Sequence, residues 1–400
     1  MEYISRQIEK TLLDLTLQFP AVAVCGPRQT GKSTLLKKIL GSRYTYATFD
    51  DPVLRERAKT DPRLFLSELG SRVILDEIQY VPEILSYLKI AIDNQRQKNG
   101  QFILTGSQQF QLIKNLGDSL AGRIALLNLL PFNRKEIVSA RKTKSLSHKA
   151  SFLNACLTGS YPEPVVKIKI NVDEWYSGYI QTYLERDVRG TYGVGSLLDF
   201  QRFLRLLAGR CSQILNLSGF ANELGVAVST IKNWLSILVA GQIVFLLPPY
   251  FNNFGKRVVK NPKVYFSDCG LATYLTGLRT KDAILYGPLA GPLFENYVVQ
   301  ETLKTFYAAG RRPDIYYYRT HKGLEIDLAI HANGKITPFE IKMTKSPGPG
   351  MAQNILKAAA LSNDFDLQKA GLITLGDESY KLSKNIKIYS LSDFLEQIIV

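Results

Sequence analysis

The chain has 400 residues, 46% of them hydrophobic, and its 50 Lys and Arg against 35 Asp and Glu give a formal net charge of +15. That length suits a globular protein of two or three domains, and no apolar run approaches the roughly 18 residues that cross a bilayer, which argues against a membrane protein. The charge favours a polyanionic partner such as DNA, although a basic surface that is merely solvated has the same composition.

The first functional pattern is a phosphate-binding loop. An amphipathic helix is predicted within residues 4–17, and an apolar strand follows at residues 21–25. Gly26, Gly31, Lys32 and Ser33 then fit GxxxxGK[ST], and a helical run comes next. Backbone N–H groups of such a loop turn inward around a triphosphate, the lysine reaches its β- and γ-phosphates, and the Ser33 hydroxyl ligates Mg²⁺.

We therefore predict ATP and Mg²⁺ as cofactors. The predicted nucleotide-binding residues form one continuous stretch: Gly26, Pro27, Arg28, Gln29, Thr30, Gly31, Lys32, Ser33 and Thr34.

Two carboxylates end the next strong strand pattern, residues 72–77. The carboxyl ends of strands are where a doubly wound sheet places its ligands. Asp76 is the expected partner of Mg²⁺, and Glu77 is expected to polarise the attacking water. The alternative is that both acids merely begin the following helix.

A third strand, residues 101–107, ends in small polar residues, and it is expected to lie between the other two strands. It would direct Thr105 or Ser107 at the γ-phosphate, and we favour Ser107 as the catalytic sensor. Arg123 follows soon after, where an arginine finger from a neighbouring subunit would lie; a surface ion pair is an equally good reading. The finger would imply a homo-oligomer.

The motifs GPRQTGKST, VILDEIQ, ILTGSQ and SLAGR together resemble the ATPase domain of a large prokaryotic family of AAA-type (ASCE P-loop) ATPases. The likeness extends to later segments at residues 129–132, 159–162 and 183–188. Members of that family often carry a further C-terminal domain. Most AAA sensor residues are Asn, so Ser107 departs from the pattern.

The middle of the chain is predicted to be helical. Residues 133–150 are interpreted as a partly exposed connector, and residues 152–209 are helical by pattern. Residues 217–235 have helix-turn-helix character, and two β-like runs at 243–247 and 263–266 would form a wing. Such a module reads DNA through the second helix, at Thr230, Lys232 and Asn233, or serves only for packing.

The C-terminal region contains a hairpin signal, Asn333-Gly334 between two alternating runs. Strand alternation places Asp327, Glu340 and Lys342 on one face. Two carboxylates, Asp327 and Glu340, would bind Mg²⁺ at a scissile phosphate, and Lys342 would steady the developing charge. The arrangement resembles the PD-(D/E)xK nuclease fold, and Glu295 on the preceding helix would add a third carboxylate.

We predict an α/β protein: a doubly wound P-loop ATPase sheet, then a helical and winged-helix region, then a restriction-endonuclease-like α/β domain. The expected boundaries are 1–135 for the ATPase, 136–210 for a connector and helical lid, 211–270 for the winged helix and 285–400 for the nuclease-like domain. The expected activity is ATP hydrolysis coupled to DNA, with possible Mg²⁺-dependent cleavage. The alternative is an ATP-dependent switch that binds DNA or a protein and carries an inactive nuclease-like module.

Cysteine usage bears on the compartment. Four cysteines lie far apart without a CxxC pair, and the N-terminus lacks a charged-then-apolar signal segment, so we expect a cytoplasmic protein. The three histidines do not cluster with these cysteines, which makes a zinc site improbable.

Overall fold

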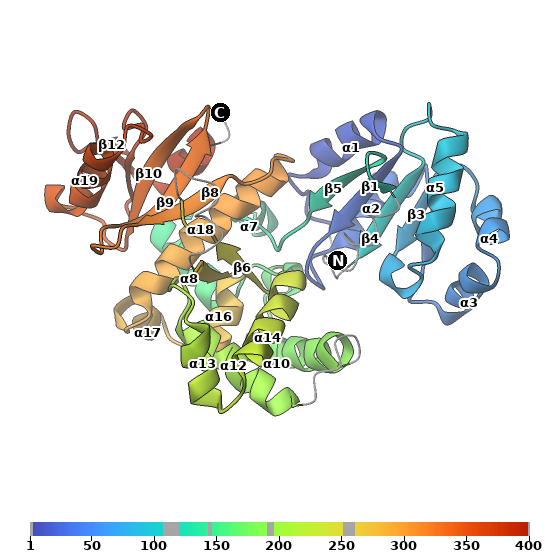
Figure 1. The fold of residues 1–400 in the computed structure, drawn as a ribbon, viewed down its shortest axis with the longest axis horizontal. Coiled ribbons are helices and arrows are strands. Elements are labelled where there is room, and N and C mark those ends of the chain that lie inside the picture. The colour runs from blue at the N-terminus through green and yellow to red at the C-terminus, as the bar shows by residue number, and fades with distance from the viewer. Residues whose placement is uncertain (1–2, 107–119, 143–145, 190–195, 251–260, 399–400) are drawn as a thin grey trace. The chain divides into compact units, whose positions relative to one another are not determined.

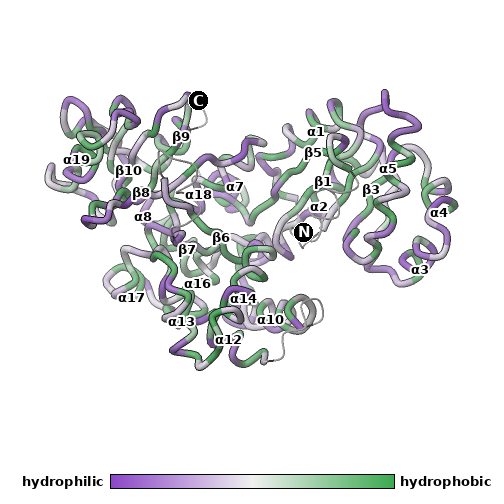
Figure 2. Tube along the Cα trace, in the orientation of Figure 1, coloured by the Kyte–Doolittle hydropathy of each residue, from purple (hydrophilic) through white to green (hydrophobic). Residues whose placement is uncertain are grey.

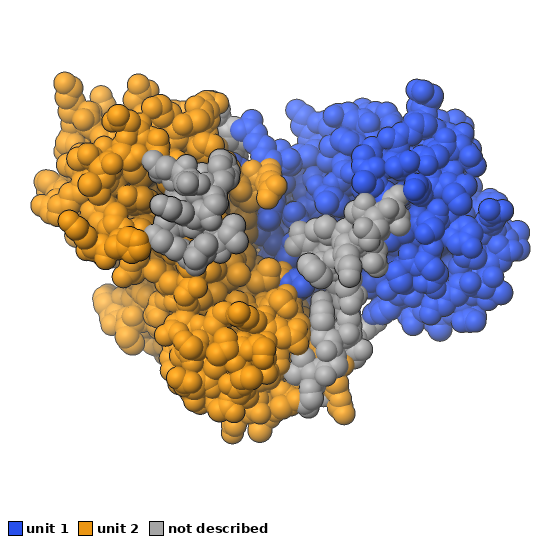
Figure 3. Space-filling view, viewed as in Figure 1, with its two compact units in different colours: residues 1–140, 240–242, 306–311 blue, residues 141–239, 243–305, 312–400 orange. Residues whose placement is uncertain are grey.

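The computed structural model describes residues 3–106, 120–142, 146–189, 196–250 and 261–398. The chain forms two compact units (Figure 3). Unit 1 comprises residues 1–140, 240–242 and 306–311, and unit 2 comprises residues 141–239, 243–305 and 312–400. The four cysteines are all buried and free.

Unit 1 is built on a five-stranded parallel sheet (Figure 1). Its strands are β1 (Ala21–Cys25), β2 (Thr45–Thr48), β3 (Val73–Asp76), β4 (Phe102–Gly106) and β5 (Ile124–Asn128). Their order is β2-β3-β4-β1-β5, so β4 lies between β3 and β1 as predicted. In Figure 2, β1 and β3 are mostly hydrophobic, as expected for strands covered on both faces.

The helices of unit 1 cover both faces of the sheet. They are α1 (Glu9–Gln18), α2 (Lys32–Leu40), α3 (Pro52–Thr60), α4 (Pro62–Leu69), α5 (Ile84–Asn94) and α7 (Arg134–Ala140), with a short 3₁₀ turn η1 (Ile78–Tyr80). Val22 and Val24 of β1 pack in one core with α1 and α2. Ala21 and Ala23 pack in another with α3, α4 and α5. Alternation along one strand therefore produces the doubly wound arrangement.

The partly exposed connector predicted for residues 133–150 begins with a helix. Helix α7 occupies its first part, and Glu136 and Ile137 are buried there. The Asn133 side chain accepts from the Glu136 N–H at 3.0 Å, and the Glu136 carboxylate accepts from the Asn133 N–H at 3.0 Å. This reciprocal capping box satisfies two helix-start donors and fixes where the helix begins.

The first half of unit 2 is helical, as predicted. Its helices are α8 (His148–Leu157), α9 (Pro162–Val166), α10 (Val172–Tyr183), the π-helical η2 (Leu184–Arg189), α12 (Leu197–Gly209), α13 (Leu217–Leu224), α14 (Val228–Ala240), α16 (Cys269–Thr276), α17 (Lys281–Tyr286) and α18 (Ala290–Ala308). Helices α13 and α14 meet at a bend of 110°. Strands β6 (Val244–Leu247) and β7 (Lys263–Phe266) then pair antiparallel, as the predicted wing requires.

Within the described part of the chain, no single helix has both the length and the hydrophobicity to cross a membrane. The bent pair α13 and α14 meets those two criteria only when both helices are taken together.

The second half of unit 2 is a mixed six-stranded sheet in the order β12-β13-β11-β10-β9-β8. Its elements are β8 (Ile315–Arg319), β9 (Glu325–Ala332), β10 (Lys335–Lys342), η3 (Pro349–Ala352), α19 (Gln353–Leu361), β11 (Gly371–Thr374), β12 (Tyr380–Lys381), β13 (Lys387–Tyr389) and α20 (Leu391–Gln397). The Asn333-Gly334 turn joins β9 to β10, as predicted, with positive φ at both residues. Strands β10 and β11 run parallel, and α19 lies between them in the chain.

A buried carboxylate holds the helical part of unit 2 together. Asp268, 1% exposed, accepts from the Ser160 N–H at 2.7 Å and the Ser160 hydroxyl at 2.6 Å. It also accepts from the Tyr176 hydroxyl at 2.5 Å and from the N–H of Leu271, which it caps at the start of α16, at 2.8 Å. Four buried hydrogen-bond donors therefore depend on the Asp268 carboxylate as their acceptor.

Replacing Asp268 with Ala is expected to leave those donors unsatisfied, which costs on the order of 3 kcal/mol or more. The midpoint of thermal unfolding, measured by calorimetry, should fall by about 5–10 °C. The matched control, Asp282→Ala, changes an exposed carboxylate of the same unit. A variant at Asp268 that unfolds at the same temperature as that control would contradict this role.

Candidate functional site

The phosphate-loop motif connects β1 to α2 in the way its sequence predicted. Gly31 begins α2 with a left-handed backbone, φ 89° and ψ 24°. At Gly26 a side chain is excluded for another reason, because a Cβ atom would lie 2.1 Å from the carbonyl oxygen of Leu129. Both glycines are thus required by the backbone path of the loop.

Lys32, the first residue of α2, is buried with 5% of its surface exposed. Its ammonium group donates to the carbonyl oxygens of Gly26 at 2.9 Å and Pro27 at 2.8 Å. It forms no ion pair with any described residue. Burial lowers the pKa of Lys32, while Glu77 and Asp76 act to raise it. A buried cation held only by neutral carbonyls is stabilised by an anion that enters the loop.

The remaining predicted loop residues differ in accessibility. Thr30 is buried, and its hydroxyl donates to the Pro27 carbonyl at 3.0 Å. Arg28 and Ser33 are half-buried, whereas Gln29 and Thr34 are exposed. These positions agree with a loop that presents its backbone inward, and the nucleotide contacts of the individual side chains stay predictions.

Asp76 lies at the carboxyl end of β3 and is oriented by two hydroxyl groups. Thr105 donates to Oδ1 and Tyr46 donates to Oδ2. Burial and the bond to Asp76 raise the pKa of Tyr46, so its hydroxyl stays protonated as a donor. The Ser33 side chain acts to lower the pKa of the same hydroxyl, so it lies close to Tyr46. Ser33 and Asp76, the predicted metal ligands, are therefore brought to one place, with Tyr46 between them.

Glu77 takes a left-handed backbone conformation, φ 56° and ψ 48°, which is uncommon for a residue with a side chain. Its N–H donates to the Thr105 hydroxyl at 3.2 Å, and its carboxylate accepts from the Gln79 amide. The Gln79 amide orients the Glu77 carboxylate. Backbone strain of this kind is concentrated at functional sites.

The two other predicted catalytic residues have different outcomes. Ser107 lies outside the described residues, so its role as a sensor stays a prediction, while Thr105 is committed to Asp76. Arg123 forms a two-point ion pair with Asp93, Nε to Oδ1 at 2.7 Å and Nη2 to Oδ2 at 2.9 Å. It precedes β5, at the amino end of the strand, and its action as a finger in a second subunit also stays a prediction.

Sequence reasoning missed a buried arginine that supports the loop. Arg6 donates to the carbonyl oxygens of Thr30 at 2.9 Å and Leu130 at 2.7 Å, and it pairs with Glu136 at 3.1 Å. Its guanidinium also lies over the Phe132 ring, 4.8 Å from the centroid. The sequence signal was the Asn-x-x-Glu pattern at residues 133–136, which is typical of a capped helix start and indicates a structural role for Glu136.

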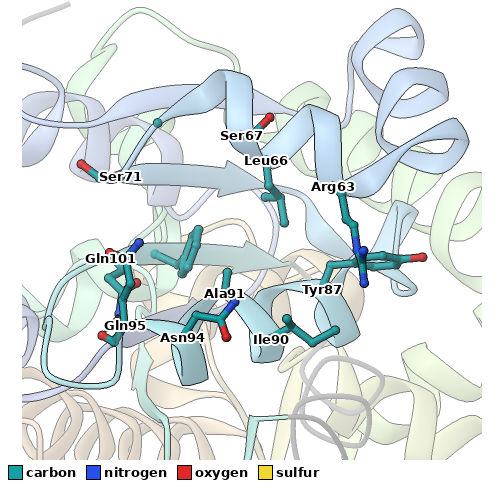
Figure 4. Close-up of a pocket in the computed structure, with 12 residues that line it drawn as sticks. Arg63, Leu66, Ser67, Ser71, Tyr87, Ile90, Ala91, Asn94, Gln95 and Gln101 are labelled. Carbon is teal, nitrogen blue, oxygen red and sulfur yellow. Dashed lines mark hydrogen bonds between the residues drawn. The ribbon is translucent and has the colours of Figure 1, made fainter.

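A cavity of about 490 Å³ in unit 1 is separate from this chemistry (Figure 4). Leu66, Ala91 and Phe102 line it between α4 and α5, and Arg63 and Tyr87 lie together at one end. Phe102 is the first residue of β4, so the cavity lies at the amino ends of the strands. Ligands of doubly wound sheets bind at the opposite, carboxyl ends.

Unit 2 brings the predicted nuclease residues together. The β9–β10 ladder ends at Phe339 opposite Leu328, and beyond it the Asp327 Oδ2 accepts from the Ile341 N–H at 2.8 Å. The Lys342 ammonium lies 3.2 Å from Asp327 Oδ2 and 2.5 Å from Glu340 Oε2. Burial and Asp327 raise the pKa of Glu340 to about 8, although Lys342 acts to lower it.

Glu295 on α18 joins this centre through Lys263 and Tyr265 of β7. Its Oε1 accepts from the Lys263 ammonium at 2.9 Å and the Tyr265 hydroxyl at 2.6 Å. Burial raises the pKa of Glu295 to about 7; Lys263 opposes this rise, and Asp327 adds to it. No set of three or more Asp, Glu, His or Cys side chains in the described ranges is arranged to hold a metal ion.

The Asp327–Glu340 pair nevertheless fits a hydrated Mg²⁺. Glu340 is 1% exposed, and its Oε1 atom is buried without a hydrogen-bond partner among the described residues. The donors to Asp327 among the described residues, the Ile341 N–H and the Lys342 ammonium, both reach Oδ2. Mg²⁺ is commonly held by one or two carboxylates, with water and phosphate oxygens completing the shell.

Three family descriptions match the chain in succession. Residues 18–138 match an AAA domain, residues 149–282 match a domain of unknown function, DUF8612, and residues 290–394 match another, DUF4143. The walker-type ATPase PABY2304 of Pyrococcus abyssi has a TM-score of 0.49 and 18% identity, with 68% of this chain and 96% of that chain covered. That likeness is too weak to bear on fold or function.

Similar sequences span most of the chain. The uncharacterized protein MJ1544 of Methanocaldococcus jannaschii is 23% identical over 83% of this chain and 76% of its own length. The uncharacterized protein Rv2008c of Mycobacterium tuberculosis is 30% identical over 372 residues, 92% of this chain and 79% of its own length. The chain therefore belongs to the family of Rv2008c, and its N-terminal part is an AAA-type P-loop ATPase domain that binds nucleotide.

Proposed function

We propose that this protein hydrolyses ATP at the loop of residues 26–33. The observation that carries the proposal is the buried Lys32 ammonium, which among the described residues donates to the Gly26 and Pro27 carbonyls and to no carboxylate. Desolvating a cation without a carboxylate partner is unfavourable, and a triphosphate supplies the missing negative charge. The AAA domain matched at residues 18–138 supports the same reading.

The residues at the carboxyl end of β3 have complementary tasks in this proposal. Ser33 and Asp76 would hold the Mg²⁺, which supplies charge neutralisation at the phosphates. Thr105 and Tyr46 fix the Asp76 carboxylate, so that its orientation is set before nucleotide arrives. Glu77, held by Gln79, accepts the proton of the attacking water and positions it in line.

Changing Glu77 to Gln should therefore separate binding from chemistry. We expect hydrolysis, measured as phosphate release, to fall about 100-fold or more because the general base is lost. ATP affinity, measured by calorimetry, should persist in this variant. Lys32→Ala should instead weaken ATP binding by at least about tenfold, because charge-assisted hydrogen bonds to phosphate disappear.

The control for this experiment is Arg57→Ala, which removes an exposed ion pair with Glu68 in the same unit. Its hydrolysis rate should match that of the unchanged protein. Hydrolysis by Glu77→Gln at the rate of this control would exclude Glu77 as the catalytic base.

A second activity, metal-dependent cleavage of DNA in unit 2, is supported by the Asp327–Glu340–Lys342 arrangement. The net charge of +15 favours a polyanionic substrate. On α14, Lys232 and Asn233 are exposed, so they are accessible to a DNA groove if α13, α14 and the β6–β7 ribbon act as a winged helix. In the alternative function, the same module recognises DNA or a protein and cuts nothing.

Incubation of duplex DNA with Mg²⁺ distinguishes these two functions. We expect cleavage by the unchanged protein and by Asp76→Ala, and loss of cleavage in Asp327→Ala because a metal ligand is removed. Lys384→Ala, an exposed lysine of the same sheet domain, is the control and should cut normally. Intact DNA in every reaction would favour the regulatory alternative, and binding that does not weaken with salt would point to a protein partner.

A further inference from the structure

The predicted nuclease centre contains an acidic cluster that is larger than its sequence motif. The acidic cluster consists of four carboxylates from one helix and two strands: Glu295 on α18, Glu325 and Asp327 on β9, and Glu340 on β10. Four carboxylates in a partly buried site need cations nearby, since their mutual repulsion is weakly screened there. Such a cluster has enough oxygen ligands for two divalent ions, as in two-metal hydrolases.

One half of the acidic cluster already contains a cation from the protein. The Lys263 side chain, 3% exposed, places its ammonium 2.9 Å from Glu295 Oε1 and 2.6 Å from Glu325 Oε1. The Tyr317 ring, with its centroid 5.7 Å away, covers another side of the ammonium. The second oxygen of Glu325 pairs with Arg319 at 3.0 Å. These carboxylates therefore have their charge balanced without a metal.

The other half of the acidic cluster is different. Lys342 reaches Asp327 Oδ2 and Glu340 Oε2, but Glu340 Oε1 is buried and has no hydrogen-bond partner in the part of the chain that the structure describes. Since Glu340 is 99% buried, that oxygen has no access to bulk water in compensation. An unsatisfied carboxylate oxygen beside a second carboxylate points to a cation ligand.

We propose that Lys263 takes the place of a second metal ion, so that the acidic cluster binds one divalent cation, at Asp327 and Glu340. Strand β7 of the wing thus contributes a fixed charge to the sheet domain. This proposal rests on the second proposed function, DNA cleavage in unit 2, only in what the bound metal is used for. Metal stoichiometry is measured without DNA, so a failure of cleavage and a failure of this proposal are separate results.

The test counts Mn²⁺ bound to the full-length chain, without nucleotide, by electron paramagnetic resonance of the free ion. All proteins carry Asp76→Asn, which removes the predicted ligand in unit 1. We expect one Mn²⁺ per chain in this background and none after Glu340→Gln. Lys263→Met should bind two, because Glu295 and Glu325 become available, and Lys263→Arg should return the count to one.

Glu295→Gln provides the deciding variant if Lys263→Met does not fold. Its amide oxygen still accepts from Lys263, so we expect a count of one and an unchanged Mn²⁺ affinity. Loss of Mn²⁺ in Glu295→Gln would show that Glu295 is a metal ligand, and that result overturns the proposal. A count of zero or two in the background protein, or a folded Lys263→Met that still binds one, also overturns it.

Discussion

The structure of unit 1 depends on a buried ammonium group that pairs with no carboxylate of the described residues. Lys32 is held by two main-chain carbonyls of a loop whose path requires glycine at positions 26 and 31. The surrounding fold keeps this arrangement rigid, because Arg6 ties the loop to the segment after β5 through backbone carbonyls. A preorganised cation of this kind binds phosphate without reorganising at the moment of binding.

The two candidate centres are electrostatic opposites. In unit 1, a cation is buried among neutral acceptors and calls for an anion. In unit 2, carboxylates are crowded together, and the protein supplies cations of its own through Lys263 and Lys342. The first centre is therefore specific for a charged ligand that arrives from solution, whereas the second is already largely neutralised.

The sequence was most informative where chemistry and backbone geometry coincide. The phosphate loop, Asp76 at a strand end, the central place of β4 and the Asn333-Gly334 hairpin were all predicted, since each has a local signature. Hydrogen-bond partners that lie far apart in the sequence were not predicted. Tyr46 precedes Asp76 by 30 residues and Lys263 precedes Glu295 by 32, and no local pattern announces either pairing. The Asn133–Glu136 capping box also has a local sequence pattern, but the segment was predicted to be a partly exposed connector.

The central claim is that Ser33 and Asp76 hold the metal of a bound nucleotide beside Lys32. A crystal structure of the chain with Mn²⁺ and a non-hydrolysable ATP analogue, with anomalous scattering used to find the metal, tests it most directly. The account predicts an anomalous peak between the phosphates, the Ser33 hydroxyl and the Asp76 carboxylate, with the Lys32 ammonium on the phosphates. Nucleotide bound elsewhere, or phosphates in the loop with no peak near Asp76, would contradict it.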